Sequence, residues 1–354
     1  MSKFFTPTLA HLTPYTPGEQ PQDMQYIKLN TNENPYPPSP KAVAAITAAE
    51  CEKLRLYSDP ACADLIASIA QQYGLATNQV MVGNGSDENL YFALRAFCDE
   101  ARPLAVADIT YGCYAVWCDL LRVPMDIIPL REDFTLCPAD YHGKGETIVI
   151  ANPNAPTGIA LTPVQIEGVL QTNPNNVVIV DEAYIDFGAQ SCVSLIANYP
   201  NLLVVQTYSK SRSLAGARLG FAMGDAALIA DLNAVKFSLN PYNVNRLTLV
   251  AGAAAMADTE YFAKTCSAIT QTRALVCTQL EALGFSILPS QTNFLFAKHG
   301  KCSGDVLYQK LKESGVLVRH FGAPRIAEYL RITIGTPAEM EVFLHKLSVI
   351  LQEV

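Results

Sequence analysis

Short apolar runs alternate with stretches of helical periodicity over roughly residues 41–240. The runs at 148–150, 177–180 and 202–205 are continuously apolar, which is typical of strands buried on both faces of a parallel sheet. Between such runs, apolar residues recur at helical spacing, as at positions 90, 93, 94 and 97. This alternation predicts an α/β domain with a mostly parallel sheet that is covered by helices.

The pattern changes on either side of this region. Residues 1 to about 40 are rich in proline and polar residues and predict an irregular arm. Past Pro241, a helical stretch from about 244 to 283 precedes several strand-like segments, and a capping box at Thr336–Glu339 opens a final amphipathic helix. We therefore expect a large domain over 33–246, and an N-terminal arm plus a smaller α+β domain formed by 1–32 and 247–354.

Polar residues follow three of the apolar runs at equal intervals. Asn152, Asp181 and Lys210 are separated by 29 residues each, about the length of one strand–helix–strand unit. Since parallel strands end at the same edge of a sheet, and ligands bind at that edge in α/β proteins, these three side chains are predicted to share one site.

The chemistry of these residues suits a phosphorylated aldehyde. Lys210 could form a Schiff base if burial or the nearby Arg218 keeps its amine neutral. Asp181, drawn out of water after a buried strand, needs a partner such as a protonated pyridine nitrogen. Tyr184 and Asn152 could hold a phenolic oxygen of the same ring. Taken alone, Lys210 could equally be a surface lysine and Asp181 a helix N-cap.

A phosphate site is predicted beside them. Residues 83–87, Gly-Asn-Gly-Ser-Asp, precede a helix and offer backbone N–H groups, here at Ser86 and Asp87. The Gly-Lys-Ser/Thr ending of a Walker loop is absent. Ser209 and Arg218 could supply the remaining contacts. Tyr111 could stack on a planar ring, or it could be an ordinary core or surface tyrosine.

Two arginines in the small domain point to a second anion. Arg331 lies inside an apolar strand pattern, and Arg319 follows the apolar run 316–318. An arginine in such a place needs an anionic partner. Both could bind a negatively charged substrate group, and both could instead form structural salt bridges.

Composition narrows the class of protein. The chain has 354 residues and a formal charge of −8, which argues weakly against nucleic-acid binding. No apolar run approaches the roughly 18 residues of a membrane helix, and the N-terminal segment is not of the signal-peptide kind. The ten cysteines and five histidines are scattered without metal-binding spacing. We expect free thiols, a cytoplasmic location, no membrane contact and no metal site.

Together these motifs closely resemble the fold-type I, pyridoxal-phosphate-dependent aminotransferases, and within them the histidinol-phosphate aminotransferase family. The resemblance is carried by Pro14–Gly18, Leu29–Pro35, Tyr57–Pro60, Gly85–Glu88, Asn152–Gly158, Asp181–Tyr184, Ser209–Lys210, Ala215–Arg218, Pro241–Asn245 and Leu330–Gly335. The Asn-Pro-x-x-Pro-Thr-Gly, Asp-Glu-x-Tyr and Ser-Lys set is highly specific for the cofactor and the fold. The family resemblance also implies seven strands for the mostly parallel sheet.

The resemblance implies pyridoxal 5'-phosphate as the cofactor and a role for each matching residue. Lys210 would form the Schiff base and Asp181 would pair with the pyridine nitrogen, while Asn152 and Tyr184 would hold the phenolic oxygen and Tyr111 would stack on the ring. The phosphate contacts would be Ser86, Asp87, Ser209, Arg218 and, from the neighbouring subunit of a homodimer with shared sites, Tyr57. The substrate contacts would be Tyr15, Asn32, Tyr242, Arg319 and Arg331.

The reaction implied is transamination between a small-molecule amino donor and a 2-oxo acid acceptor. In this family the pair is histidinol phosphate and 2-oxoglutarate, a step of histidine biosynthesis. An aromatic amino-acid aminotransferase would share every cofactor residue, and a threonine-phosphate decarboxylase has a similar phosphate-reading pocket. The fold also serves as the effector-sensing half of transcription regulators, but those carry a basic DNA-binding domain upstream, and this chain begins almost at once with the arm.

Overall fold

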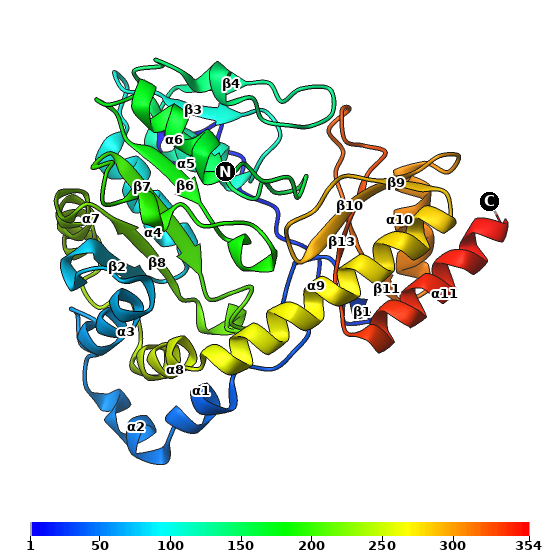
Figure 1. Cartoon of the computed structure of the whole chain (residues 1–354), viewed down its shortest axis with the longest axis horizontal. Coiled ribbons are helices and arrows are strands. Elements are labelled where there is room, and N and C mark those ends of the chain that lie inside the picture. Colours follow the sequence, from blue (N-terminus) through cyan, green and yellow to red (C-terminus); the bar gives the residue numbers. More distant parts are fainter. Residues whose placement is uncertain (1, 354) are drawn as a thin grey trace.

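The computed structural model describes residues 2–353 and is built around a seven-stranded sheet (Figure 1). Its strands are β2 (Val80–Gly83), β3 (Leu104–Ala107), β4 (Met125–Ile128), β5 (Thr147–Ala151), β6 (Val178–Asp181), β7 (Leu202–Thr207) and β8 (Gly220–Gly224). Their order across the sheet is β2-β8-β7-β6-β5-β3-β4. The strands from β3 to β7 are parallel, and β8 runs antiparallel to both β2 and β7. The mostly parallel α/β sheet that the sequence predicted is therefore confirmed.

Helices cover both faces of this sheet. They are α3 (Ala63–Tyr73), α4 (Ser86–Phe97), α5 (Cys113–Leu121), α6 (Pro163–Thr172), α7 (Ala226–Leu239) and α8 (Arg246–Ala257). Two shorter helices, α1 (Pro40–Ala45) and α2 (Ala48–Glu52), contact α8. One apolar cluster joins one face of the strands to α3, α6 and α8, and another joins the alternate strand residues to α4, α5 and α7. Burial of both faces explains why the strands read as continuous apolar runs.

The second body is a small α+β unit (Figure 1). Its antiparallel sheet has the order β12-β13-β10-β9, with β9 (Phe285–Ile287), β10 (Phe294–His299), β12 (Arg319–His320) and β13 (Leu330–Thr333). The helices α9 (Thr259–Ala282), α10 (Gly304–Glu313) and α11 (Pro337–Glu353) accompany it. The described residues also contain seven short 3-10 helices, most of them in the large body: Pro7–Leu9, Lys53–Arg55, Thr77–Gln79, Pro138–Tyr141, Ile185–Phe187, Val193–Leu195 and Ala215–Ala217.

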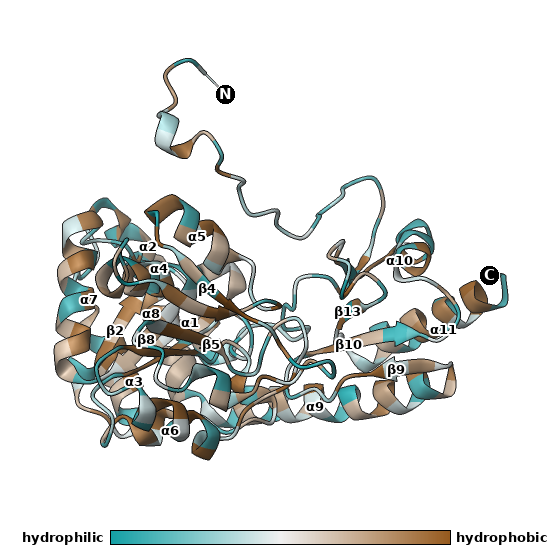
Figure 2. Cartoon of the chain, turned by 90° about the horizontal axis from the view of Figure 1, so that it is seen from above, coloured by the Kyte–Doolittle hydropathy of each residue, from teal (hydrophilic) through white to brown (hydrophobic). Residues whose placement is uncertain are grey.

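The N-terminal arm belongs partly to this small body. Strand β1 (Ile27–Lys28) pairs in parallel with β11 (Val316–Leu317). Figure 2 shows the segment before β1 as an extended chain that runs apart from the packed helices and strands. The residues just after β1 lead the chain from the small body into the large one, so the arm crosses between them (Figure 1).

The helical stretch expected over 244–283 is present, and it is divided into two helices, α8 and α9. The break lies at Asp258, whose backbone has φ −92° and ψ 66°. Its carboxylate accepts a hydrogen bond from Ser39 and pairs with Lys41 at 3.0 Å. α8 packs against α1 and α3, so these contacts favour a domain boundary near Asp258, while the division between residues 246 and 247 stays a prediction. No helix within residues 2–353 has the length and apolarity needed to cross a bilayer.

Candidate active site

A cavity of ≈ 330 Å³ lies at the carboxyl edge of the parallel strands. Its lining comes from segments far apart in the sequence: Thr31, Glu33, Ser86, Asp87, Tyr111, Ala151, Pro153, Ala155, Asp181, Ala183, Tyr184, Thr207, Ser209, Lys210, Ala215, Gly216 and Arg218. The register explains the meeting of Asp181 and Lys210, since Asp181 pairs with Val205 on the strand that leads to Lys210. The structure therefore brings most of the predicted cofactor residues together.

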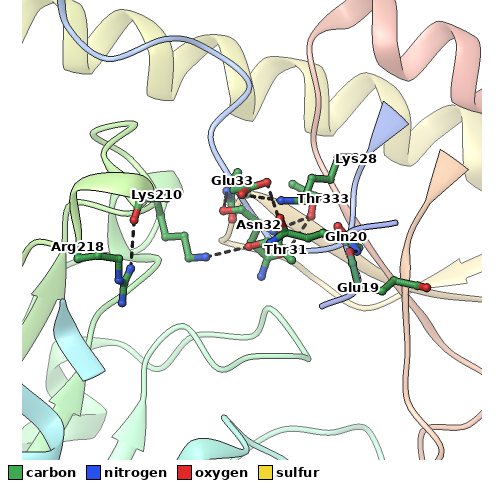
Figure 3. Close-up of polar contacts among 12 residues, drawn as sticks. Glu19, Gln20, Lys28, Thr31, Asn32, Glu33, Lys210, Arg218 and Thr333 are labelled. Carbon is green, nitrogen blue, oxygen red and sulfur yellow. Dashed lines mark hydrogen bonds and ion pairs between the residues drawn. The ribbon is translucent and has the colours of Figure 1, made fainter. Parts of the chain in front are cut away.

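Lys210 points across this cavity toward the arm (Figure 3). Its Nζ donates to the carbonyl oxygen of Thr31 at 3.0 Å and lies 5.7 Å from the centre of the Tyr184 ring. Asn34 anchors the lysine's backbone, because its amide donates to the carbonyl oxygens of Lys210 and Ser211. The arm thus forms one wall of the site and gives the amine a neutral partner.

Asp181 lies buried at the end of β6, opposite the space that a ring would occupy. Its Oδ2 accepts from the hydroxyl of Tyr114 at 2.5 Å, and its Oδ1 accepts from the N–H of Ala183 at 3.1 Å. Burial raises the pKa of this carboxyl to about 6. Among the described residues it takes part in no ion pair. A buried carboxylate of this kind suits a cationic ring nitrogen.

The other end of the cavity is built for a phosphate. Gly85 has φ +89° and turns the chain into α4, so that the N-terminus of this helix of 12 residues opens at Ser86. Arg218 donates to the Ser209 hydroxyl at 3.4 Å and pairs with Asp87 at 3.4 Å. A helix N-terminus, a hydroxyl and a guanidinium are the groups that bind phosphate in proteins. The residues therefore fit pyridoxal phosphate at both ends.

Aromatic residues line the space between these ends. Tyr111 donates to Asp87 at 3.1 Å, and its ring meets Tyr15 edge-on with centroids 6.0 Å apart. The Tyr184 hydroxyl accepts from the Asn32 amide at 2.9 Å, which leaves the tyrosine's own proton free to donate. Asn32 is itself held, at φ +57°, by two hydrogen bonds with Thr333.

Asn152 lies between two residues that line the cavity, Ala151 and Pro153, and its side chain also binds the backbone. Its amide donates to the carbonyl oxygen of Leu161 at 3.1 Å and its Oδ1 accepts from the Leu161 N–H at 2.7 Å. The side chain is buried and is absent from the cavity lining, where Pro153 and Ala155 stand instead. One amide hydrogen and the Oδ1 therefore close the loop between 152 and 161, while the second amide hydrogen stays available and the role of Asn152 as a cofactor contact stays a prediction.

Arg319 and Arg331 are direct cross-strand neighbours in β12 and β13. Arg331 donates to the Asn30 carbonyl at 2.9 Å, its Nε has no hydrogen-bond partner, and burial lowers the pKa of its guanidinium. Arg319 donates to the carbonyls of Thr16 and Pro17 at 3.2 and 3.3 Å. Neither forms an ion pair within the part of the chain that the structure describes. Two facing like charges are unfavourable, so this pair suits an added anion.

Tyr57 and Tyr242 lie elsewhere. Their rings stack on each other with centroids 4.4 Å apart, and Tyr57 is 79% exposed. Neither lines the cavity of its own chain. Leu54 and Leu56 are exposed and line the same surface hollow as the two tyrosines, and the exposed Leu239 is close to Tyr242 in the sequence. Within one chain the structure therefore leaves both predicted contacts away from Lys210.

The chain was compared with known proteins. Residues 24–347 match the family model described as aminotransferase class I and II. The chain belongs to this family. It is 54% identical to the histidinol-phosphate aminotransferase of Marinomonas sp. (strain MWYL1), over 96% of this chain and 97% of that protein. It is 49% identical to histidinol-phosphate aminotransferase 1 of Bordetella parapertussis, over 98% and 99% of the two chains.

Solved structures show the same fold. A histidinol-phosphate aminotransferase from Sinorhizobium meliloti, in complex with pyridoxal-5'-phosphate, has a TM-score of 0.90 at 22% identity and covers 100% of this aminotransferase and 99% of that chain. An aspartate aminotransferase mutant from Thermus thermophilus has a TM-score of 0.83 at 16% identity, over 99% and 100%. The predicted fold and the predicted aminotransferase class are confirmed.

Three residues of this aminotransferase's site were missed from the sequence. Thr31 and Glu33 line the cavity, and Glu33 is held by Lys28 at 2.7 Å and by the Thr31 hydroxyl at 2.9 Å (Figure 3). Both residues belong to the segment Leu29–Pro35 that also contains Asn32, so they could have been predicted from that motif. Tyr114 touches Asp181 from α5, and nothing in the sequence distinguishes it from a core tyrosine.

Proposed function

We propose that this aminotransferase transfers the amino group of histidinol phosphate to 2-oxoglutarate, with pyridoxal 5'-phosphate as its cofactor. The observation that carries the chemistry is one cavity that holds a lysine amine, a buried carboxylate and a phosphate cradle. The choice of substrate is supported by relatives of that name that are 54% and 49% identical over nearly the whole chain. Such a step belongs to histidine biosynthesis.

The residues divide the work as follows. When bound, the cofactor supplies an electrophilic aldehyde and an electron-withdrawing ring. Asp181 holds a proton on the ring nitrogen, and Tyr184 donates to the ring's phenolic oxygen. A free Lys210 amine would take the proton from the substrate carbon as a general base and return it as a general acid. The N-terminus of α4 with Ser209 and Arg218 anchors the phosphate, while Tyr111 covers the ring.

The arginine pair would bind the anionic groups of the substrates. Among the described residues, the Nε of Arg331 has no hydrogen-bond partner, and Arg319 donates hydrogen bonds only to backbone carbonyls. A phosphate from one substrate and a carboxylate from the other are both bidentate anions that such guanidinium groups bind. Tyr15 lies edge-on against Tyr111, which lines the cavity. The pair would therefore serve both half-reactions.

The alternatives predict different products. A threonine-phosphate decarboxylase from Porphyromonas gingivalis shares the fold with a TM-score of 0.80 at 22% identity, a likeness that bears on the fold alone. A substrate panel with 2-oxoglutarate separates the cases: histidinol phosphate should have the highest kcat/KM. A higher value for phenylalanine, or carbon dioxide released from threonine phosphate, would refute the proposed substrate.

Lys210→Ala tests the chemistry itself. The variant should lose the visible absorbance band of the bound cofactor and its turnover, because no other amine lines the cavity among the described residues. Lys298→Ala, on an exposed lysine of β10, is the matched control and should behave as wild type. A Lys210→Ala enzyme with an undiminished band and full turnover would refute the mechanism.

We further propose a cytoplasmic homodimer in which Tyr57 and Tyr242 act in the partner's site. Support comes from their distance from their own cavity and from the exposed apolar residues beside them. The ten free cysteines agree with a reducing compartment. When inactive Lys210→Ala is mixed with a defective Tyr57→Ala, each hybrid dimer should regain one of its two sites and thus about half of the activity of a wild-type dimer, because that one site has both residues. No restoration on mixing would place Tyr57 outside the shared site.

A further inference from the structure

We propose that Tyr114 is a positioning residue whose hydroxyl keeps the Asp181 carboxylate ionised and aimed at the cavity. The proposal deepens the proposed function, because it rests on the role given to Asp181. Tyr114 does not line the cavity. It would act only through the carboxylate that it touches.

The contact between the Tyr114 hydroxyl and the Asp181 carboxylate is short and buried. Tyr114 projects from α5, is 1% exposed, and donates to Asp181 Oδ2 at 2.5 Å. Bonds between a hydroxyl and a carboxylate in this range are charge-assisted and stronger than neutral ones. The other oxygen of Asp181 accepts from the Ala183 N–H. Tyr114 is therefore the one side chain among the described residues that donates to this acid.

The environment otherwise opposes ionisation. Burial raises the pKa of Asp181 to about 6, and the nearby Asp87 carboxylate raises it as well, whereas the Tyr114 hydroxyl and the Ala183 N–H lower it. The other charged groups around the same cavity are Lys210, Arg218 and Glu33. Without the hydroxyl, Asp181 would be protonated over more of the neutral range. A protonated acid would pair poorly with a ring nitrogen that must carry its own proton.

Tyr114 also packs against Tyr111, which lines the cavity. Its ring meets Tyr111 edge-on, with centroids 5.5 Å apart at 89°, and Trp117 packs near both at 6.1 Å. One buried side chain therefore contacts both the proposed partner of the ring nitrogen and the proposed stacking tyrosine. A merely space-filling tyrosine would need its ring for this packing but not its hydroxyl.

Removing a single oxygen separates the two roles. Tyr114→Phe keeps the ring and deletes the hydrogen bond, and Tyr141→Phe is the matched control. Tyr141 is fully buried, and its hydroxyl has no hydrogen-bond partner. Both variants are compared with wild type as cofactor-free protein by denaturant unfolding between pH 4 and 8. This readout needs no catalysis.

The expected result is a pH-dependent defect in one variant. An acid whose pKa is raised by folding loses its stabilising contribution as the pH rises through the folded pKa. Loss of a hydrogen bond to a charged group should move that midpoint for Asp181 upward by about 1 pH unit. The folding constant of Tyr114→Phe relative to wild type should therefore fall roughly tenfold further between pH 5 and 8. Tyr141→Phe should show no such trend, and parallel curves for both variants would overturn the proposal.

A second background guards against a variant that fails to fold. In Asp181→Asn the titrating acid is gone, so adding Tyr114→Phe should produce a loss that is the same at every pH. A pH trend that persists in the Asn background would overturn the proposal. The affinity for pyridoxal phosphate at pH 7.5 gives a separate test, with about tenfold weaker binding expected for Tyr114→Phe. Unchanged cofactor affinity in Asp181→Asn would instead refute the role of Asp181, while the pH test of Tyr114 would stand.

Discussion

Gly220 offers a direct test of how tightly the phosphate cradle is built. It begins β8 and pairs with Gly83 on β2, directly below the turn that starts α4. A Cβ added at Gly220 would lie 2.2 Å from the Ser86 nitrogen and 2.5 Å from the Gly85 carbonyl carbon. Both are backbone atoms, so no side-chain rotation can relieve the overlap.

The size of the effect follows from that distance. Ordinary contact begins near 3.4 Å, so the N-terminus of α4 and β8 must separate by about 1.2 Å in Gly220→Ala. Overpacking of this kind costs about 1–3 kcal/mol of folding free energy. The same displacement moves the N–H groups proposed to hold the cofactor phosphate. A misplacement of about 1 Å can cost on the order of a hundredfold in a positioned contact.

The assay is a fluorescence titration of cofactor-free protein with pyridoxal phosphate, together with its thermal unfolding. Gly220→Ala should bind the cofactor about 10- to 100-fold more weakly, which corresponds to about 1.4–2.7 kcal/mol, and should unfold at a lower temperature. Gly322→Ala is the control, because an added Cβ there has nothing within 4 Å and its φ is not positive. Wild-type affinity in Gly220→Ala would show that the turn at Ser86 does not hold the phosphate.

Further predictions concern the pH response, the helix junction and the arm. Because folding raises the pKa of the buried Glu182 from its ordinary value of 4.5 to about 7, the stability of cofactor-free protein should fall between those two pH values by up to about 1.4 kcal/mol per pH unit. Glu182→Gln should flatten the dependence of the unfolding free energy on pH, and an unchanged slope would exclude Glu182 as the titrating group. Ser39 caps α1, so Ser39→Ala should cost about 0.5–2 kcal/mol in urea unfolding, against within about 0.5 kcal/mol for the exposed Ser238→Ala. Glu19 accepts from Tyr308, so Glu19→Gln should speed hydrogen exchange of residues 15–20 by about two- to fivefold; unchanged exchange would mean that this contact does not hold the arm.

Much of the site followed from local pattern. Continuous apolar runs predicted buried parallel strands, and polar residues at their ends predicted a shared edge, because both depend on chain direction and burial rather than on distant contacts. Asp181 and Lys210 line one cavity for that reason. The spacing could not tell where a side chain at the strand end would turn. It gave no sign, for example, that the Asn152 side chain would also bind the backbone of Leu161.

The helix past Pro241 shows a second limit. Its periodicity continues through Asp258, yet hydrogen bonds with Ser39 and Lys41, more than 200 residues earlier, end α8 there. Such contacts are invisible to a local pattern because they depend on how the finished fold brings distant segments together.

The sequence by itself determined the strand–helix order, the cofactor motif and the residues that carry the chemistry, since each depends on residue type and short-range spacing. The tertiary structure alone decided that the arm's Thr31 receives the Lys210 amine, that Tyr114 supports Asp181, and that Tyr57 stacks on Tyr242 away from its own cavity. These arrangements join residues from separate elements. They exist only once the chain has folded, because each joins segments that are distant in the sequence.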